Sequence, residues 1–144
     1  MRREMGGSAA RAFGTLYRRF QTEVNAGYAA RGWKGVTLAH VQFLMEIDEP
    51  GTRLSEVASA LKTTRQYAGK LAKDLEAKRL VTLTPDPLDG RAVLAKPTER
   101  GHALFQDACE VRAEMEGKFL AALAPGRAAA FAGMLEDLVA ALDG

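Results

Sequence analysis

The sequence has 144 residues, of which 47% are apolar, so it can form one domain with a buried core and is not a disordered tail. Its net charge of +2 is too small to indicate a nucleic-acid partner by itself. No apolar run approaches the roughly 20 residues that cross a membrane, and the first residues lack the apolar core of a secretion signal. We therefore expect a cytoplasmic protein with no membrane partner.

Residues with the chemistry for catalysis or metal binding are few. A single cysteine, Cys109, excludes an intramolecular disulfide and a multi-cysteine zinc site, and its place beside Ala108 indicates a buried thiol. His40 and His102 have no second histidine at ligand spacing, so we expect ordinary polar side chains, no metal site and no cofactor. The sequence has no glycine-rich phosphate loop and no nucleophile elbow, which argues against an enzyme.

Charge is distributed unevenly along the chain. Residues 1–52 carry a net charge of +2, residues 53–100 carry +4, and residues 101–144 carry −4. A basic centre beside an acidic C-terminal third favours a protein that presents one face to an anion.

Apolar residues recur at helical spacing through most of the chain, and one central segment has the pattern of a hairpin. The helices are expected at 8–30, 37–47, 55–61, 63–78, 98–123 and 127–142. Gly27 and the run RGWKG after it are expected to end the first helix. Two short β-rich segments, VTLTP and AVLAKP, surround the turn sequence DPLDGR at 86–91. The predicted architecture is mainly helical with a small β-hairpin.

The central helices carry capping signals at their starts. Thr37 is expected to cap the second helix, and Thr63 or Thr64 the fourth, because hydroxyl side chains accept hydrogen bonds from the free N–H groups there. The segment from Thr63 to Gln66 also matches the S/T-x-x-E/Q capping box. A tight turn at Lys62 and Thr63 joins the third and fourth helices, which makes them a helix-turn-helix.

The 63–78 helix has two unlike faces when its residues are placed at about 100° intervals. One face is small or apolar and should pack inward: Thr64, Ala68, Leu71, Ala72 and Leu75. The other side presents amide and cationic groups, among which Arg65 can bond guanine and Gln66 adenine in a major groove, while lysines further along meet phosphates. Gly69 costs roughly 1 kcal/mol of helix stability relative to alanine, and the close approach of something large is one reason to keep it.

The hairpin loop ends in Arg91, a residue that can reach a minor groove. The same loop contains Asp86 and Asp89, which would repel phosphate unless one of them is paired. We expect Asp89 to form a salt bridge with a nearby arginine and so to stiffen the loop. A basic helix face or an acidic loop alone is usually only solvated surface, but a tight turn, a basic helix and a hairpin in this order favour DNA binding.

Four segments carry a family resemblance: LSEVASAL at 54–61, TTRQYAGKLAKDLEAKRLV at 63–81, DPLDGRAV at 86–93 and PTERG at 97–101. With them, residues 37–101 resemble the winged helix-turn-helix core of the MarR family, the multiple antibiotic resistance regulators. The D-x-x-D-x-R wing is the most specific piece. Arg79 stands where the family commonly has glycine. Arg53 stands where the family often has a threonine or serine cap, so Thr52 or Ser55 is expected to cap the third helix.

The resemblance implies a mainly α fold with a small β-hairpin wing, in one compact domain overall. Its parts would be an N-terminal dimerisation helix at 1–36, a DNA-binding core at 37–100 and C-terminal dimerisation helices at 101–144. It also implies a homodimeric transcription regulator that binds a pseudo-palindromic operator in double-stranded DNA, usually as a repressor released by a ligand. The candidate DNA-binding residues are Thr63, Thr64, Arg65, Gln66, Tyr67, Lys70 and Lys73 of the recognition helix and Arg91 of the wing, with Asp89 as the wing brace.

Four aromatic residues are candidates to line an effector pocket: Phe13, Tyr28, Trp33 and Phe43. Aromatics at helical spacing more often belong to a hydrophobic core, but a small aromatic or phenolic effector is the ligand that such a pocket would hold. Two other functions stay open at this point. One is a winged helix whose basic face docks an acidic protein, and the other is a small-molecule-binding protein without operator binding.

Overall fold

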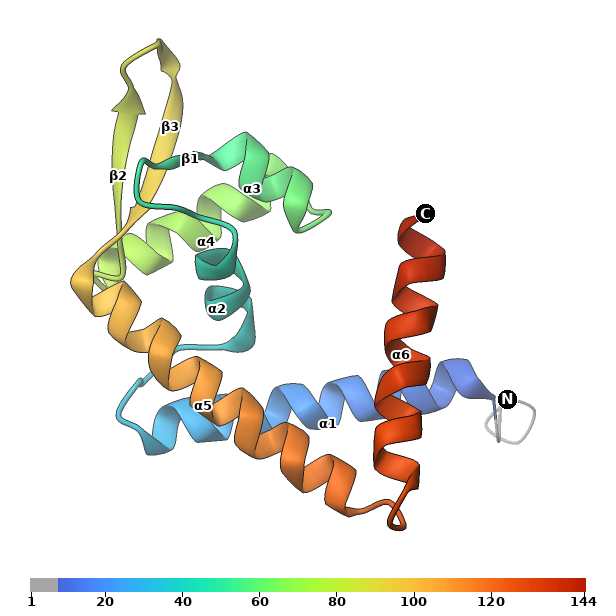
Figure 1. Ribbon diagram of the computed structural model, residues 1–144. Coiled ribbons are helices and arrows are strands. Elements are labelled where there is room, and N and C mark those ends of the chain that lie inside the picture. The colour runs from blue at the N-terminus through green and yellow to red at the C-terminus, as the bar shows by residue number, and fades with distance from the viewer. Residues whose placement is uncertain (1–7) are drawn as a thin grey trace, which may run out of the picture. The chain divides into compact units, whose positions relative to one another are not determined.

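The computed structural model describes residues 8–144, which are mainly helical with one small antiparallel sheet (Figure 1). The helices are α1 (Ala9–Ala30), α2 (Leu38–Met45), α3 (Leu54–Ala60), α4 (Arg65–Ala77), α5 (Glu99–Ala121) and α6 (Arg127–Asp143). The strands are β1 (Thr52–Arg53), β2 (Val81–Asp86) and β3 (Asp89–Pro97), in the sheet order β1-β3-β2. The predicted fold class is confirmed. The sequence prediction lacks β1, because a two-residue strand leaves no periodicity.

The chain divides into two compact units, Met1–Val111 and Arg112–Gly144. The first unit holds α1 to α4, the sheet and the first part of α5, and the second holds the end of α5 and α6. The three segments expected from the sequence, 1–36, 37–100 and 101–144, stay a prediction. Residues 1–7, on which the expectation about a secretion signal partly rests, lie outside the described residues.

Helix α1 begins at its cap Ser8, whose hydroxyl accepts a hydrogen bond from the Arg11 N–H at 3.3 Å. The helix predicted at 8–30 is confirmed, because α1 ends at Ala30 just before the RGWKG run, but Gly27 itself does not interrupt it. Gly27 instead allows close packing, since a Cβ at this position would lie only 2.6 Å from a methyl group of Val111. Glycine is therefore needed at this position because α5 packs closely against α1, and it does not mark the end of the helix.

The turn between α3 and α4 is closed by backbone hydrogen bonds. Lys62 adopts φ +52°, and the next N–H, that of Thr63, donates to the Ala58 carbonyl at 2.9 Å. This is a helix end of the Schellman type, with a left-handed residue just past the cap. Thr64 caps α4 and its hydroxyl accepts from the Tyr67 N–H at 3.1 Å. One of the two predicted caps is thus confirmed, but the capping box that begins at Thr63 is wrong, because the helix begins one residue later.

The start of α5 packs directly on the end of α4. Thr98 accepts a hydrogen bond from the Gly101 N–H at 3.0 Å and donates one to the Arg79 carbonyl at 2.8 Å. A Cβ on Gly101 would lie 2.2 Å from the Leu80 carbonyl oxygen, a distance that no side chain can accommodate. The PTERG segment therefore joins α5 to the helix-turn-helix through a threonine cap and a glycine that lets two backbones touch.

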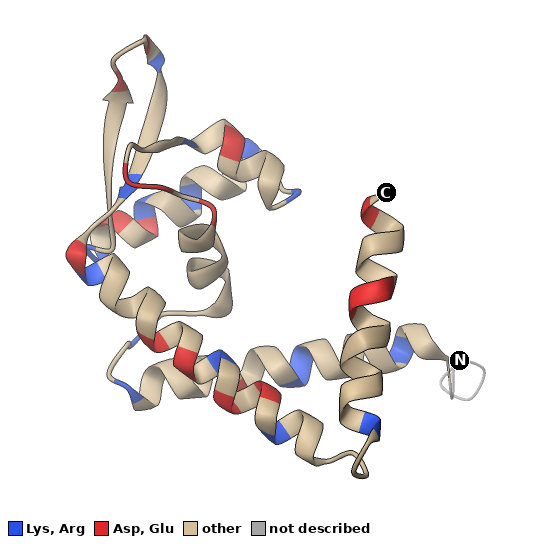
Figure 2. Cartoon of the chain, viewed as in Figure 1, with Lys and Arg blue, Asp and Glu red and all other residues tan. Residues whose placement is uncertain are grey.

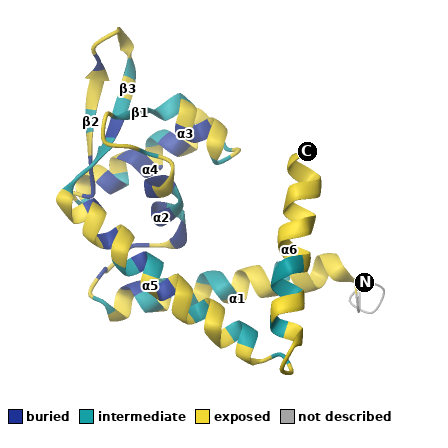
Figure 3. Ribbon diagram, in the orientation of Figure 1, coloured by how far each residue is buried: buried dark blue, intermediate teal, exposed yellow. Residues whose placement is uncertain are grey.

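The core of the first unit lies among α1, α2, α3, α4, α5 and the base of the hairpin, where buried positions lie close to one another (Figure 3). Its largest fully buried side chains are Tyr28, Phe43, Leu75, Leu80, Leu104, Val24, Val57, Val81 and Val111. Helix α4 contacts α2, α3 and β2, so it is held from three sides. This packing fixes the rotation of α4 about its own axis.

We predict that Arg79→Gly raises the free energy of unfolding by about 1 kcal/mol. Arg79 has φ +60°, a left-handed conformation that a residue with a Cβ adopts only at a cost, and its exposed side chain has no hydrogen bond or ion pair among residues 8–144. Glycine also makes the unfolded chain more flexible, which offsets part of the gain. Urea denaturation of both proteins measures the difference.

Arg79→Ala is the matched control, because alanine removes the guanidinium and keeps the Cβ. It should change stability by only a few tenths of a kcal/mol. Equal stability of the glycine and alanine variants would contradict the assignment of strain to this position.

Candidate nucleic-acid interface

Helix α4 buries one face and exposes the other. Ala68, Leu71, Ala72 and Leu75 are buried, as predicted. Thr64 was expected on the same inward face but is exposed, because it is the cap that precedes the helix. The exposed residues of α4 that were selected from the sequence are Arg65, Gln66, Tyr67, Lys70 and Lys73. The helix thus presents a polar, cationic surface over an apolar base.

Four cations in this region carry no hydrogen bond or ion pair from their side chains within residues 8–144: Arg65, Lys70, Lys73 and Arg91. Three other cations of the first unit have partners, since Arg53 binds Asp86, Lys78 binds Asp74 and Arg100 lies over the Trp33 ring. Figure 2 shows the basic positions on α4 and the hairpin, while α5 carries a run of acidic ones. The four unoccupied charges are therefore available to phosphate groups.

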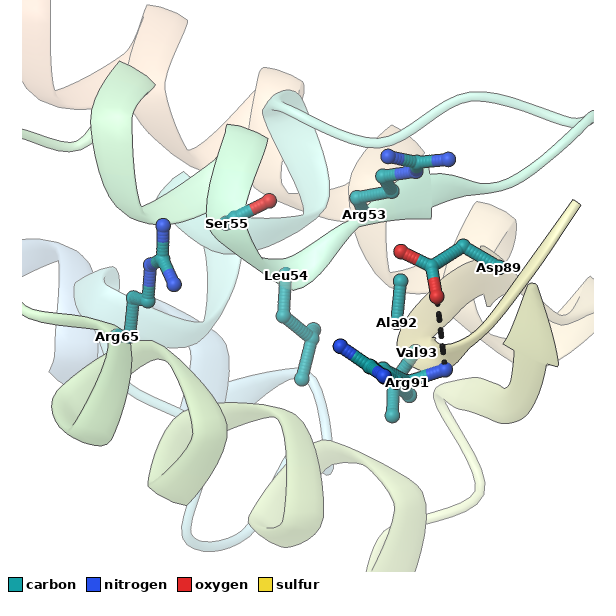
Figure 4. A pocket seen from close by; sticks show the side chains of 8 residues that line it. All are labelled: Arg53, Leu54, Ser55, Arg65, Asp89, Arg91, Ala92 and Val93. Carbon is teal, nitrogen blue, oxygen red and sulfur yellow. Dashed lines mark hydrogen bonds between the residues drawn. The ribbon is translucent and has the colours of Figure 1, made fainter.

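Arg65 and Arg91 line one pocket of about 460 Å³, although 26 positions separate them in the chain (Figure 4). Its lining residues are Arg53, Leu54, Ser55, Arg65, Asp89, Arg91, Ala92 and Val93. They come from β1, the start of α3, the start of α4 and β3. The pocket combines guanidinium groups with an apolar floor, which suits an anion that also has carbon surface, such as the phosphate and sugar of a nucleic acid.

The wing is the hairpin of β2 and β3, with a two-residue connection at Pro87 and Leu88. Its carboxylate Asp86 is buried at the base of the loop, where Arg53 donates to it through Nε at 2.7 Å and lies within 2.6 Å through Nη2. The Leu88 N–H also donates to Asp86, at 2.9 Å. These contacts hold the wing tip to the start of α3.

The predicted salt bridge of Asp89 is wrong. Asp89 accepts a hydrogen bond from the backbone N–H of Arg91 at 3.1 Å, whereas the ion pair at the wing belongs to Asp86 and Arg53. Arg53 can reach Asp86 because β1 pairs with β3, so the strand missing from the prediction supplies the partner. The role of Asp89 as a brace is thereby reduced to ordering the loop backbone.

The hydrogen bond from the Leu88 N–H, followed by the contact with Arg53, lowers the pKa of Asp86 below its ordinary value of 3.8. A carboxyl whose pKa is lower in the folded state stabilises the fold above its unfolded pKa, and that contribution is lost as the pH falls through the lowered value. The ion pair at the wing is therefore complete at neutral pH, and it is lost only when the pH falls below the ordinary titration range of an aspartate.

The predicted cap of α3 is also wrong. The Thr52 hydroxyl pairs with Asp48, accepting from its N–H at 3.1 Å. The cap position belongs to Arg53, whose N–H donates to the Glu56 carboxylate at 3.2 Å. An acidic side chain in the first turn of α3 thus replaces the expected hydroxyl cap.

His40 has a larger role than the sequence indicated. It is buried beneath α4, and its Nε2 lies 2.5 Å from the Asp74 carboxylate. Its Nδ1 accepts a hydrogen bond from the Thr37 N–H at 2.9 Å, next to the predicted and confirmed cap of α2. The hydrogen bond to His40, together with that from Lys78, lowers the pKa of Asp74. His40 thereby connects α2 to α4. The sequence did not indicate this burial, because His40 has no local pattern that points to a partner.

The four aromatic residues proposed for an effector pocket separate into two groups. Tyr28, Trp33 and Phe43 are buried, whereas Phe13 on α1 is 49% exposed. Trp33 donates from its indole nitrogen to Asp107 on α5 at 2.7 Å. These three buried residues thus belong to the core of the first unit, and their role in lining an effector pocket stays a prediction.

Other predictions about isolated side chains have mixed outcomes. Cys109 is half-buried, so the expectation of a buried thiol is wrong. His102 is exposed and pairs with Glu49. Residues 8–144 contain no group of three or more histidine, cysteine or acidic side chains placed to bind a metal ion. No described helix has both the length and the apolar character that crossing a membrane requires.

Comparisons with known proteins identify similar sequences and folds. Residues 34–92 match a sequence model described as MarR family. Among curated proteins, none matches the sequence. The structure of apo wild-type MarR from E. coli superposes with a TM-score of 0.77 at 18% identity, covering 91% of this chain and 96% of that one.

Two further solved structures have the same fold. MepR of S. aureus, determined as a complex with DNA, gives a TM-score of 0.76 at 18% identity over 93% of this chain and 98% of that chain. BpsR of Bordetella bronchiseptica, whose DNA binding is regulated by 6-hydroxynicotinic acid, gives 0.75 at 19% identity over 94% and 95%.

Proposed function

The winged-helix core of this chain belongs to the MarR family, and on that premise we propose that the protein is a transcription regulator that binds double-stranded DNA at a specific sequence. One observation carries the proposal. Helix α4 has its apolar face in the core and presents Arg65, Gln66, Lys70 and Lys73 outward, with no partner for these four side chains among the described residues. Free cations and an amide on one helix face are what a major groove accommodates.

The roles of the side chains follow from their positions on the helix. Arg65 and Gln66 lie in the first turn of α4 and would meet base edges, together with Thr63, Thr64 and Tyr67 around the helix start. Lys70 and Lys73 lie further along and would meet phosphates. Arg91 would enter the adjacent minor groove from the wing. These assignments separate contacts that read sequence from contacts that supply affinity.

The operator is proposed to be pseudo-palindromic and the protein a homodimer that acts as a repressor in the cytoplasm. Apolar side chains remain exposed on α1 and, separately, on α6, and a second copy would cover them. They are Phe13, Leu16 and Tyr17 on α1 and Met134, Leu138, Val139 and Leu142 on α6. Helix α6 buries none of its residues within the chain, which is typical of an element that packs against another molecule.

A small aromatic or phenolic acid is proposed as the effector. The support is the fold that this chain shares with BpsR, whose DNA binding responds to 6-hydroxynicotinic acid. Differential binding of such a ligand to two states of the dimer would release the operator.

We predict that Arg65→Ala weakens operator binding by about 1–3 kcal/mol and relaxes the preference at one base position, because a bidentate contact with a base is lost. Lys73→Ala is the matched comparison. It should weaken binding to all sequences evenly and reduce the slope of log affinity against log salt by about one. Binding to a selected operator and to its single-base variants, measured over a range of salt concentrations, separates the two effects. Full retention of sequence preference in Arg65→Ala would contradict the role of that arginine.

We predict that Gly69→Ala has opposite effects on folding and on DNA binding. Apart from its chain neighbours and the backbone of its own helix, no described atom lies within 4 Å of a Cβ built on Gly69, so packing does not require glycine there. Alanine should therefore raise the free energy of unfolding by about 1 kcal/mol, while its methyl group hinders close approach of a DNA backbone and weakens binding. Denaturation and operator binding are measured on the same variant, and unchanged affinity would show that the helix does not approach DNA at this residue.

A further inference from the structure

The tip of the wing exposes a leucine. Leu88 is 91% exposed, more than any other large apolar side chain among the described residues. It forms the two-residue connection between β2 and β3 together with Pro87, at the far end of the hairpin (Figure 1). Single exposed apolar residues are common on proteins, so exposure alone assigns no role to Leu88.

The backbone around Leu88 is held in place from both sides. The Leu88 N–H donates to Asp86, which is buried and bound by Arg53. On the other side, Asp89 accepts from the Arg91 N–H, and Pro87 has a fixed φ. The protein therefore orders the tip before any partner arrives, so binding through Leu88 would cost little conformational entropy.

Apart from Arg91, the tip has no positive charge that is free to bind a phosphate. Asp86 is neutralised by Arg53, and Asp89 opposes the charge of Arg91 next to it. A surface with nearly balanced charge releases few counterions from DNA. What the tip offers a duplex is the carbon surface of Leu88, and the walls of the minor groove are lined by the carbon atoms of the deoxyribose rings.

From these observations we infer that Leu88 is a DNA-contact residue, whose side chain packs on the sugar walls of the minor groove that Arg91 enters. The inference rests on the proposed function, since it assigns a further residue of the same interface. Its contribution is apolar, and it therefore differs from that of Arg91 in being insensitive to salt. Among proteins that bind the minor groove, leucine and proline are known as apolar contact residues.

The test measures binding of the full chain to a duplex selected from random DNA, over a range of salt concentrations. Leu88→Ala should bind about fivefold more weakly with an unchanged salt slope, because apolar area and no charge is lost. Leu88→Met, which keeps an apolar side chain of similar volume, should bind within about twofold of wild type. Leu88→Lys should steepen the salt slope by about one, because it adds a cation beside phosphates.

Parallel variants distinguish the failure of this inference from the failure of the proposed function. If Arg65→Ala and Arg91→Ala weaken binding while Leu88→Ala does not, Leu88 makes no contact and the proposed function stands. A Leu88→Ala protein with a reduced salt slope would also overturn the inference, because the contact would then be electrostatic. If the wild-type chain selects no duplex, the inference and the proposed function both fail. Unchanged thermal unfolding of the Leu88 variants verifies that only binding is affected.

Discussion

The rotation of α4 about its axis is the constraint on which the interface depends. Leu71 and Leu75 are buried at the centre of the first unit, and burial of a leucine side chain stabilises a fold by about 1.5–3 kcal/mol relative to leaving it exposed. A turn of the helix by one residue would expose these side chains and bury Lys70 or Lys73 in their place. The position of each cation on the surface is therefore a consequence of apolar packing on the opposite side of the helix.

Polar contacts also help to fix the orientation of α4. His40 joins the start of α2 to Asp74 on α4, and both of its ring nitrogens have partners. At the other end, the helix ends in a left-handed residue, and Leu80 begins the chain that leads into the wing. Gly101 then brings α5 against the Leu80 carbonyl. Helix α4, the wing and α5 thus meet at one junction, so a shift of α5 would move α4 and the wing through direct backbone contact.

The wing depends on a separate contact. Arg53 binds Asp86 across the sheet, and this ion pair connects the hairpin to the helix-turn-helix. As a result the pocket between the wing and α4 has Arg65 on one side and Arg91 on the other. Arg65 and Arg91, which we expect to enter different grooves, are thereby held at fixed positions relative to each other. A simultaneous contact with adjacent grooves would require such a fixed arrangement.

Sequence reasoning succeeded where a periodic pattern carried the information. The apolar spacing of the helices, the face of α4 and the Thr37 cap follow from local rules, and each is present in the structure. It failed where the partner lies far along the chain. Asp86 and Arg53 are 33 positions apart and His40 and Asp74 are 34 apart, so no local pattern pairs them. Gly27 was misjudged for the same reason, because its neighbour Val111 belongs to a distant helix.

We propose that one chain presents a recognition helix and a wing to duplex DNA, and that two chains do so together. Selection of bound duplexes from a random pool tests this most directly. We expect recovery of a pseudo-palindromic sequence with half-sites about 10 base pairs apart, one helical turn centre to centre. Recovery of no common sequence, with binding that depends only on salt, would contradict it.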